Sequence, residues 1–509
     1  MSPARGRLSA AALIDLVLDD GSFASWDAPP LPVAADDDYA ATLAAAATAS
    51  GADEAVLTGE GTIKGRRVAI VVCEFGFLAG SIGVAAAERL TAAVERAVEQ
   101  RLPLLAAPSS GGTRLQEGTV AFLQMVKITA AIGRHRAAGL PYLVYLRHPT
   151  TGGVLASWGS LGNVTAVEPG ALVGFLGPRV YEALHGEPFP AGVQVAENLF
   201  EHGLVDAVVP PNRIADIAAT ALAVLSAPHE QLPDVPEPPD DPVPDVPAWE
   251  SIERSRRAGR PGVRDLLKAA ATDVTPLHGT GEGEADPGLV MTLATFGAAP
   301  CIVLGQDHPR RSAAVRITPA GLREARRGMR IAAELGLPVV SVIDTPGAAL
   351  SKDAEESGLA GEIARSLADL VALPAPTVCV LLGEGTGGAA LALLPADRVI
   401  CAQHAWLAPL PPEGASVVLH RDLDHAAELA ERQGVRSLDL LAAGIVDRIV
   451  TERPDAADEP YAFLRRLGAV LEHEIVTLLG RDGDERLGAR AERYRRLGTV
   501  PTRPGARRH

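Results

Sequence analysis

Residues 102–117 read LPLLAAPSSGGTRLQE: an apolar run ends in a Gly-Gly pair, and the helix-like run GTVAFLQMVKITAAIG begins directly after it. An apolar run, a glycine turn and a helix start in this order predict a buried strand that leads into a crossover helix. The first amides of a helix have no intrahelical partner, so such a turn is typical of an anion site. The lysine of a P-loop is missing from this turn, which argues against a nucleotide triphosphate as the anion.

The same pattern recurs at matched spacing along the chain. In the first half, Gly112 is followed 41 residues later by Gly153 in PYLVYLRHPTTGGV. In the second half, Gly347 in LPVVSVIDTPGA is followed 41 residues later by Gly388 in TVCVLLGEGTGGAA. Both halves then close on a helix-turn-strand phrase, LFEHGLVDAVV and LLAAGIVDRIV. So many ordered matches indicate a duplicated αβ unit, with parallel strands covered on both faces.

The stretch SAPHEQLPDVPEPPDDPVPDVPAWE separates the two halves. Prolines interleaved with acidic residues cannot pack a core, so the stretch is predicted to be an extended, solvated linker. The predicted organisation is a first domain at 1–225, a linker at 226–261, a second domain at 262–480 and a basic tail at 481–509. The end of that tail, RYRRLGTVPTRPGARRH, is expected to be solvated and frayed.

Bulk composition excludes several classes of protein. The chain has 509 residues, too many for one ordinary core, and a formal charge of −16 without a long basic stripe, so nucleic acid is an unfavourable partner. The four cysteines lie in strand-like runs and no C-x-x-C or HExxH spacing occurs, which predicts buried inert thiols and no metal. Near the N-terminus, LSAAALIDLVLDDG predicts an amphipathic helix capped by Ser9. No stretch is typical of a membrane span or signal peptide, and we expect a cytoplasmic protein.

The glycine turns indicate the kind of charge that the site would hold. Glycine leaves its own amide unshielded, and the helix dipole adds positive potential at the helix start. Such amides stabilise an oxygen that gains negative charge during a reaction, as in an oxyanion hole. Two sets of turns, one in each half, suggest a reaction in which two oxygens gain charge.

The motifs in order resemble the carboxyltransferase component of acetyl-CoA carboxylase and related acyl-CoA carboxylases. FGFLAGSIG, SSGGTRLQEG, PTTGGVLASWGSLG and EPGALVGFLGPRV are similar to the beta subunit, and IDTPGA, LLGEGTGGAALAL, APLPPEGASVVL and AAGIVDRIV are similar to the alpha subunit. The chain thus resembles a beta–alpha fusion. The resemblance implies an α/β fold of two crotonase-type domains related by duplication. The four-cysteine zinc ribbon that usually begins the beta subunit has no counterpart here, so no zinc is expected.

The resemblance also implies an activity. A carboxyl group passes from carboxybiotin on a carrier protein to acetyl-CoA and gives malonyl-CoA, the first step of fatty acid synthesis. The implied partners are a biotin carboxyl carrier and biotin carboxylase subunit, the acyl-CoA, and further copies of this chain, with active sites at a dimer interface. One oxyanion hole would serve the thioester oxygen and the other the ureido oxygen of biotin, in an order that stays open.

Residue matching gives the expected site. The catalytic amides are expected at Gly111, Gly112, Gly388 and Ala389. The residues expected to line the coenzyme A and biotin sites are Gly80, Ser81, Gly152, Gly153, Gly347 and Gly387. Arg114 and Glu117 are interpreted as structural partners at a helix start rather than catalytic groups. Lys64 and Lys127 are weaker candidates for the coenzyme A phosphates.

Other functions stay open at this point. The acyl group could be propionyl or longer, and Ala390 and Leu391, which follow the second hole, mark where the acyl pocket is expected. A biotin-independent malonyl decarboxylase and a catalytically silent paralogue share the same fold. An enoyl-CoA hydratase needs a carboxylate pair that we do not find. A serine hydrolase using Ser81 or Ser110 lacks a G-x-S-x-G elbow.

Overall fold

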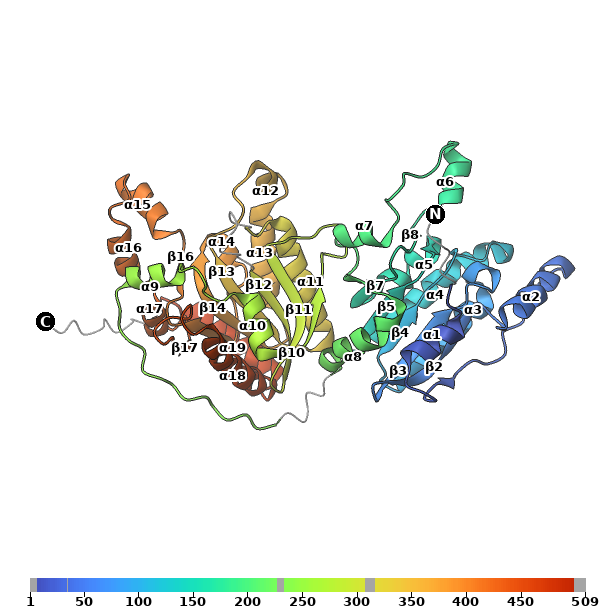
Figure 1. The fold of residues 1–509 in the computed structure, drawn as a ribbon, viewed down its shortest axis with the longest axis horizontal. Coiled ribbons are helices and arrows are strands. Elements are labelled where there is room, and N and C mark those ends of the chain that lie inside the picture. Colours follow the sequence, from blue (N-terminus) through green and yellow to red (C-terminus); the bar gives the residue numbers. More distant parts are fainter. Residues whose placement is uncertain (1–6, 34, 227–232, 307–315, 499–509) are drawn as a thin grey trace. The chain divides into compact units, whose positions relative to one another are not determined.

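The computed structural model describes residues 7–33, 35–226, 233–306 and 316–498. The chain forms two compact units: the first holds 1–226 with 281–283, and the second holds 227–280 with 284–509 (Figure 1). The boundary at 226 agrees with the composition break. Each unit is a sheet covered by helices on both faces, and each is described separately below.

The first unit is built on a seven-stranded sheet of order β1-β2-β3-β4-β5-β7-β9, with a small β6-β8 pair beside it. Its strands are β1 (Ala24–Ser25), β2 (Val56–Ile63), β3 (Arg66–Cys73), β4 (Leu104–Ala107), β5 (Tyr142–Leu146), β6 (Thr150–Thr151), β7 (Val164–Val167), β8 (Val173–Gly174) and β9 (Ala207–Val208). Its helices are α1 (Ala10–Val17), α2 (Asp37–Ser50), α3 (Val84–Glu99), α4 (Gly118–Ala137), α5 (Gly152–Leu155), α6 (Pro178–His185), α7 (Ala196–Glu201) and α8 (Ile214–Leu225), with short 3-10 turns η1 (Leu78–Gly80), η2 (Leu115–Glu117), η3 (Trp158–Ser160) and η4 (Pro211–Arg213).

The second unit has an eight-stranded sheet of order β10-β11-β12-β13-β14-β15-β17, with β16 paired to β14. Its strands are β10 (Ala271–Leu277), β11 (Leu289–Phe296), β12 (Ala299–Gln306), β13 (Val339–Thr345), β14 (Thr377–Thr386), β15 (Arg398–Ala402), β16 (Trp406–Ala408) and β17 (Arg448–Val450). Its helices are α9 (Ala248–Ser255), α10 (Val263–Ala270), α11 (Pro319–Leu335), α12 (Lys352–Glu356), α13 (Leu359–Val371), α14 (Gly387–Leu391), α15 (Pro412–His420), α16 (Ala426–Gln433), α17 (Ser437–Ala442), α18 (Pro460–Leu479) and α19 (Gly483–Arg496).

The two sheets share one topology. β3, β4, β5, β7 and β9 run parallel, as do β12, β13, β14, β15 and β17. The match extends to single hydrogen bonds: Asn163 Oδ1 accepts from the Tyr142 amide at 2.8 Å, and Asp397 Oδ2 accepts from the Thr377 amide at 2.8 Å. The predicted α/β duplication is therefore confirmed.

One feature of the sheets differs from the expectation of parallel strands alone. The first strand of each core pairs antiparallel with a hairpin partner, β2 with β3 and β11 with β12. In the first unit the turn is Lys64-Gly65, with φ of 47° and 79°. Two residues with positive φ suit the tight turn whose twist matches the paired strands. The sheets are therefore mixed, with the hairpin at one side.

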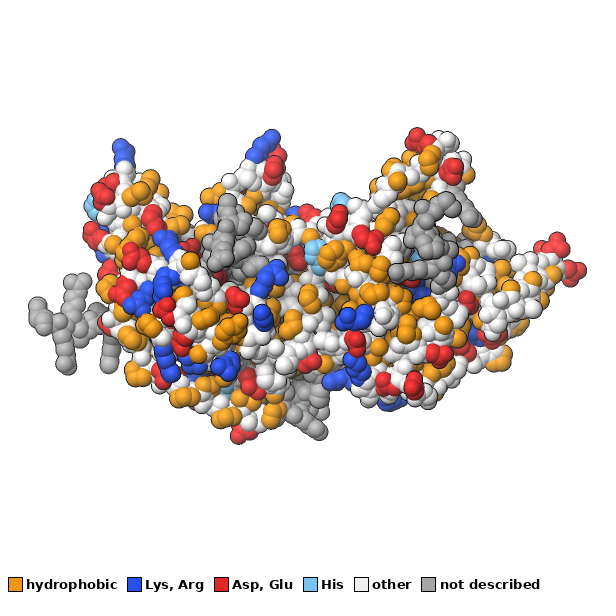
Figure 2. Space-filling view, viewed as in Figure 1, with side chains coloured by type: hydrophobic (Ala, Val, Ile, Leu, Met, Phe, Trp, Pro, Cys, Tyr) orange, Lys and Arg blue, Asp and Glu red, His pale blue; other side chains and the backbone are white. Residues whose placement is uncertain are grey.

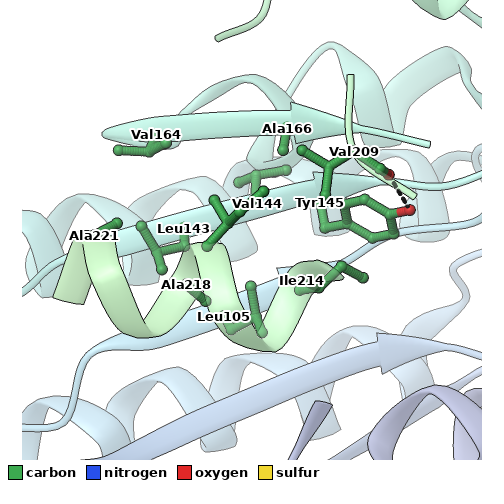
Figure 3. Close-up of a pocket in the computed structure, with 11 residues that line it drawn as sticks. Leu105, Leu143, Val144, Tyr145, Val164, Ala166, Val209, Ile214, Ala218 and Ala221 are labelled. Carbon is green, nitrogen blue, oxygen red and sulfur yellow. Dashed lines mark hydrogen bonds between the residues drawn. The ribbon is translucent and has the colours of Figure 1, made fainter. Parts of the chain in front are cut away.

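Core packing follows the strand alternation. Ala69, Val71 and Cys73, on one face of β3, lie in the same buried cluster as residues of α3 and α4. On the opposite face, α8 covers the sheet and leaves a cavity of about 30 Å³ lined by apolar side chains (Figure 3). The Tyr145 hydroxyl at the end of this cavity donates to the Val209 carbonyl at 2.9 Å, so this hydroxyl has a partner (Figure 3).

The N-terminal helix is confirmed as α1. Ser9 caps it, and its Oγ accepts from the Ala12 amide at 3.1 Å. All four cysteines are buried and free, and burial raises the pKa of Cys73 to about 11 and of Cys379 to about 12. Among the helices of the described ranges, none has the length and apolarity to span a bilayer. The same ranges hold no trio of His, Cys, Asp and Glu side chains placed to ligate a metal.

Within the range 226–261 proposed as a linker, residues 233–247 are extended but not freely solvated, and 248–255 is helical. Residues 233–247 form no helix or strand, but their carboxylates pair with arginines of the second unit. Arg448 Nε donates to Asp240 at 3.0 Å, and Arg453 Nη2 lies 2.5 Å from Asp241. From Ala248 the chain becomes helical as α9, with one apolar side buried against α16 and β16. The acidic residues thus attach the linker to the second unit, and residues 227–232 lie outside the described part.

The end expected to be solvated begins at Arg493, and the expectation is wrong for its first residues: Arg493 Nη1 donates to Asp447 at 2.6 Å, and the Tyr494 hydroxyl accepts from the Ala396 amide at 2.8 Å. Residues 483–496 form α19, and Arg490 is fully buried with Nε and Nη2 at 2.8 and 2.7 Å from the Asp397 carboxylate. A bidentate pair of this kind compensates the desolvation of a guanidinium. Arginine composition alone suggested solvent exposure because the partner carboxylate is 93 residues away in sequence. Residues 499–509 lie outside the described part.

Candidate active site

In the first unit, two glycine turns lie against each other at the carboxyl ends of β4 and β5. A Cβ built on Gly112 would lie 3.6 Å from Gly152 Cα and 3.6 Å from Gly153 N. Gly112 has φ +109° and Gly152 has φ +62°, both in the left-handed region that favours glycine. The structure therefore brings the predicted residues Gly111, Gly112, Gly152 and Gly153 together.

The turn after η1 joins the same site. Gly80 has φ +65°, and a Cβ there would lie 2.0 Å from the Ser109 carbonyl oxygen, so only glycine fits. The Gly111 amide donates to the Ala79 carbonyl at 2.9 Å, which holds this turn against the first glycine pair. The amides of Gly80 and Ser81 donate to the carbonyls of their own turn at 2.9 and 3.1 Å.

The Gly112 amide is also engaged. It donates to Ser110 Oγ at 3.0 Å. The second unit repeats this contact, since the Gly347 amide donates to Thr345 Oγ1 at 3.1 Å and Gly347 has φ +117°. Gly112 is therefore the counterpart of Gly347 in the duplication. It is not the counterpart of Gly388, although both were predicted to supply catalytic amides.

The backbone amides at the starts of the short helices α5 and α14 differ from those of the glycine turns, because they have no intrahelical acceptor. Gly388 and Ala389 occupy the first turn of α14, where backbone N–H groups have no intrahelical acceptor. Gly387 precedes them with φ +63°, as Gly152 does in the first unit. Gly388 is half-buried and thus accessible to a ligand oxygen.

For the equivalent donors of the first unit, sequence reasoning placed Gly153 among the lining residues rather than the catalytic amides, and it did not name Val154. Gly153 and Val154 occupy the first turn of α5, as Gly388 and Ala389 occupy that of α14. The signal was present in the 41-residue spacing, which aligns Gly153 with Gly388. Each unit therefore carries one helix-start pair and one glycine turn beside it.

Arg114 and Glu117 have the structural role that their positions suggested. Arg114 is fully buried, and its Nη2 donates to the Ser81 carbonyl at 2.9 Å. Glu117 Oε2 accepts from the Val84 amide at the start of α3, at 2.6 Å. Its Oε1 accepts from the Tyr39 hydroxyl at 2.6 Å, and burial, together with that bond, raises the pKa of Tyr39 to about 12. The pair thus holds the Gly80-Ser81 turn and the start of α3.

In the second unit, polar side chains hold both α14 and the Pro346-Gly347 turn after β13. Gln306 Nε2 donates to the Ala389 carbonyl at 2.7 Å, and Arg316 Nη1 donates to the Pro346 carbonyl at 3.1 Å. The Glu384 amide donates to Asp344 Oδ1 at 3.0 Å, which ties β14 to β13. The segment 307–315, which corresponds in the duplication to the Gly80-Ser81 turn, lies outside the described residues.

The other sequence candidates fall away from these turns. Lys64 pairs with Asp216 at 2.5 Å and Lys127 pairs with Glu88. Ser110 Oγ accepts from the Gly112 amide, while the Nδ1 of His148 accepts from the Leu172 amide at 3.0 Å. The residues described at the turns thus offer backbone donors rather than a serine–histidine pair.

Comparison with known proteins assigns the fold and family. The carboxyl transferase domain family matches residues 2–478. The probable biotin-dependent acyl-coenzyme A carboxylase beta3 subunit of Mycobacterium tuberculosis is 61% identical over 492 residues, which are 97% of this chain and 99% of the relative. The acetyl-coenzyme A carboxylase carboxyl transferase subunits beta/alpha of Salinispora arenicola is 38% identical over 529 residues, 99% of this chain and 93% of the relative.

Solved structures agree in fold. Transcarboxylase 12S superimposes with a TM-score of 0.73 at 22% identity, covering 92% of this chain and 89% of that chain. A single-chain, multi-domain long-chain acyl-CoA carboxylase gives a TM-score of 0.69 at 20% identity, covering 91% of this chain and 46% of that chain. These similarities confirm the predicted pair of crotonase-type domains. The chain belongs to the carboxyl transferase domain family, together with the beta subunits of biotin-dependent acyl-CoA carboxylases.

Proposed function

We propose that this protein is the carboxyltransferase of a biotin-dependent acyl-CoA carboxylase. It would transfer a carboxyl group from carboxybiotin on a carrier protein to the α-carbon of an acyl-CoA. The observation that carries the proposal is the duplicated pair of glycine turns at the carboxyl ends of two matched sheets, each beside the first amides of a short helix.

The chemistry requires donors for two oxygens. Removing a proton next to a thioester places negative charge on the thioester oxygen, and the carboxyl donor places similar charge on its ureido oxygen when the carboxyl group leaves. Preorganised amides stabilise such oxygens, and the loss of one donor typically costs roughly 3 kcal/mol of transition-state stabilisation. A strong side-chain base is unnecessary where biotin takes the proton.

In the second unit, the proposed donors are Gly388 and Ala389. Their first-turn position supports this role because no intrahelical carbonyl competes for the amides. Gly387 and Gly347 shape the two turns that border them.

In the first unit, the proposed hole lies at the Gly111-Gly112 turn, beside Gly80 and Ser81 on the coenzyme A side. The Gly111 amide is held by the Ala79 carbonyl, so Gly112 is the donor proposed at this turn. The Gly112 amide donates to a neutral hydroxyl, and an oxyanion is a stronger acceptor that takes its place. The helix-start amides of Gly153 and Val154, next to Gly152, supply further donors.

We propose acetyl-CoA as the substrate to test first, with propionyl-CoA and longer acyl-CoA as direct alternatives. The names of the relatives support both, since one is an acyl-CoA and the other an acetyl-CoA enzyme. Leu391, 48% exposed and directly after Ala390, is the side chain we expect beside the acyl group. An apolar side chain there favours an uncharged acyl group.

We further propose a cytoplasmic homo-oligomer that works with a biotin carboxylase and carrier subunit. Exposed apolar side chains support the oligomer: Phe122 and Val126 on α4 are 61% and 66% exposed, and Val418 on α15 is 69% exposed. Figure 2 shows hydrophobic side chains gathered on α6 and on α15, which project from their units. Contiguous exposed apolar surface of this kind marks interaction sites.

A decarboxylation assay tests the proposed function. The purified chain is mixed with malonyl-CoA or methylmalonyl-CoA, with and without free biotin, and the loss of substrate is followed. We expect turnover that depends on biotin. The ratio of the decarboxylation rates for malonyl-CoA and methylmalonyl-CoA then shows which acyl group the enzyme prefers. Turnover without biotin would instead support a malonyl decarboxylase, and no turnover with either substrate would support a silent paralogue.

A further inference from the structure

A basic pocket lies in the second unit at the edge opposite the glycine turns. It has a volume of about 460 Å³ and is bordered by α18, α19 and the residues that precede β15 and β17. Its cationic lining comprises Arg398, Arg481, Arg486, Arg490, Arg493 and Arg496. Strand β14 separates this edge from the α14 turn, about 30 Å away at 3.3 Å per residue. The pocket is therefore separate from the donors proposed for the carboxyl transfer in this unit.

The acidic residues of the pocket balance only part of this charge. The lining contains three carboxylates, Asp397, Asp447 and Glu492, against the six guanidinium groups, and a fourth, Glu474, lies 3.4 Å from Arg398 outside the lining. Asp397 is shared, since Arg490 Nη2 lies 2.7 Å and Arg486 Nε 3.7 Å from its Oδ2. The same Oδ2 also accepts from the Thr377 amide at 2.8 Å. An excess of positive charge in a chain of net charge −16 is a local feature that calls for an anion.

Arg486 is the least compensated of these side chains. It is 8% exposed, and its Nη2 donates to the Pro374 carbonyl. Within the described ranges, the buried Nε atoms of Arg486 and Arg493 donate no hydrogen bond, although Arg493 Nη1 donates to Asp447 and its Nη2 to the Ile445 carbonyl, both at 2.6 Å. Burial and the neighbouring Arg490 lower the pKa of Arg486, although Asp397 opposes them. A buried cation without full hydrogen bonding is costly, so a bound anion would stabilise it.

Arg481 supplies a cation at the open side of the pocket. Arg481 lies just after the C-terminus of α18, lines the pocket and is exposed to solvent. A guanidinium group at this exposed position can bind a ligand oxygen pair through two of its N–H groups.

We propose that this pocket binds a phosphate-bearing small molecule through Arg481, Arg486 and Arg493. Guanidinium groups bind phosphate oxygens in bidentate geometry, which a halide does not reproduce. A volume of about 460 Å³ lies within the range of ligand pockets and exceeds the size of one phosphate, so a phosphate on a larger group fits better than the free ion. The ligand is an effector or stabilising anion, because its pocket lies away from the α14 turn.

Binding is tested on the full chain by thermal unfolding and isothermal titration calorimetry. The probes are inorganic phosphate, pyrophosphate and adenosine diphosphate, each compared with sodium chloride at the same ionic strength. We expect saturable stabilisation that increases from phosphate to the larger probes. Equal effects of all probes and of chloride would overturn the proposal, since general screening would then explain them.

Two substitutions distinguish binding in this pocket from nonspecific attraction of anions to basic side chains. Arg481→Gln is expected to weaken binding of the strongest probe about tenfold or more, because a hydrogen bond to a charged group is lost. Arg495→Gln is the matched control, since Arg495 is exposed on α19 but does not line the pocket. Arg481→Gln leaves the buried pairs of Arg490 in place, so the variant is expected to fold. Equal affinities of the two variants would refute the site even if the wild-type chain binds phosphate.

Discussion

At the scale of single residues, glycine backbone conformation shapes the candidate site. Gly112, Gly152, Gly347 and Gly387 all have positive φ, in equivalent pairs of the two units. An L-residue with a side chain pays roughly 1–2 kcal/mol to adopt such a conformation. The turns that expose helix-start amides are thus encoded by the absence of a side chain at four positions.

Gly387→Ala tests this residue-scale argument. The change strains φ +63° and places a Cβ 3.3 Å from the Pro409 carbonyl oxygen, which displaces the first amides of α14. We expect kcat of the biotin-dependent decarboxylation to fall about a hundredfold, the usual effect of losing one oxyanion donor.

Gly444→Ala is the matched control for that variant. Gly444 has φ +73°, and a Cβ added there would meet no atom within 4 Å, so the substitution introduces the same backbone strain away from the turns. We expect a similar loss of thermal stability and unchanged kcat. Equal rates for both variants would show that α14 supplies no catalytic amide.

A buried carboxyl makes the second unit pH-dependent. Glu324 on α11 is 2% exposed, and burial raises its pKa from 4.5 to about 7. Because the folded pKa is above the unfolded one, its contribution to stability is present below pH 4.5 and is lost as the pH rises to about 7. At about 1.4 kcal/mol per unit, the free energy of unfolding is expected to fall by roughly 3 kcal/mol across this window.

Urea unfolding at several pH values between 4.5 and 7 measures the Glu324 effect. The comparison is with Glu324→Gln, which cannot ionise and is expected to show a flatter pH dependence. Parallel curves for the two proteins would contradict the shifted pKa.

At the scale of elements, each unit has a pair of packed helices, α3 with α4 in the first and α11 with α13 in the second. The spacing of apolar residues predicted strands and helices, and the repeat predicted that the units match. The hairpins β2-β3 and β11-β12 and the helix α19 were not predicted. Each hairpin pairs neighbouring segments, and its signal, such as the Lys64-Gly65 turn, was available in the sequence. The packing of α19 instead depends on Asp397, which lies 93 residues from Arg490, and no local pattern reveals that partner.

The packing of α8 on the first sheet gives a stability prediction. Leu143 on β5 is 5% exposed and lines the small cavity under α8 (Figure 3). Leu143→Ala would enlarge that cavity and is expected to lower the free energy of unfolding by about 2–5 kcal/mol. Calorimetry measures the loss. The control is Leu115→Ala, at a leucine that is 85% exposed, and we expect it to change the free energy of unfolding by less than about 0.5 kcal/mol.

At the scale of the whole molecule, the exposed apolar helices bear on assembly. Val418 on α15 is 69% exposed, and an aspartate there would place a charge in any apolar contact between copies. We expect Val418→Asp to lower the molar mass measured by light scattering, because fewer chains associate, and to lower the decarboxylation activity as well. Leu31→Asp, at an exposed residue outside helices and strands, is the control. An unchanged mass in Val418→Asp would exclude α15 from the contact.

The sequence by itself determined the duplication, the α/β class, the boundary near residue 226 and the positions of the glycine turns. These features depend on local period and on spacing, which a sequence displays directly. Only the tertiary structure decided that the Gly111 and Gly112 amides already have acceptors, and that Gly153 and Val154 stand in the first turn of a helix as Gly388 and Ala389 do. The reason is physical: whether an amide is available depends on which carbonyl or hydroxyl the fold places within about 3 Å of it, and that neighbour comes from another part of the chain.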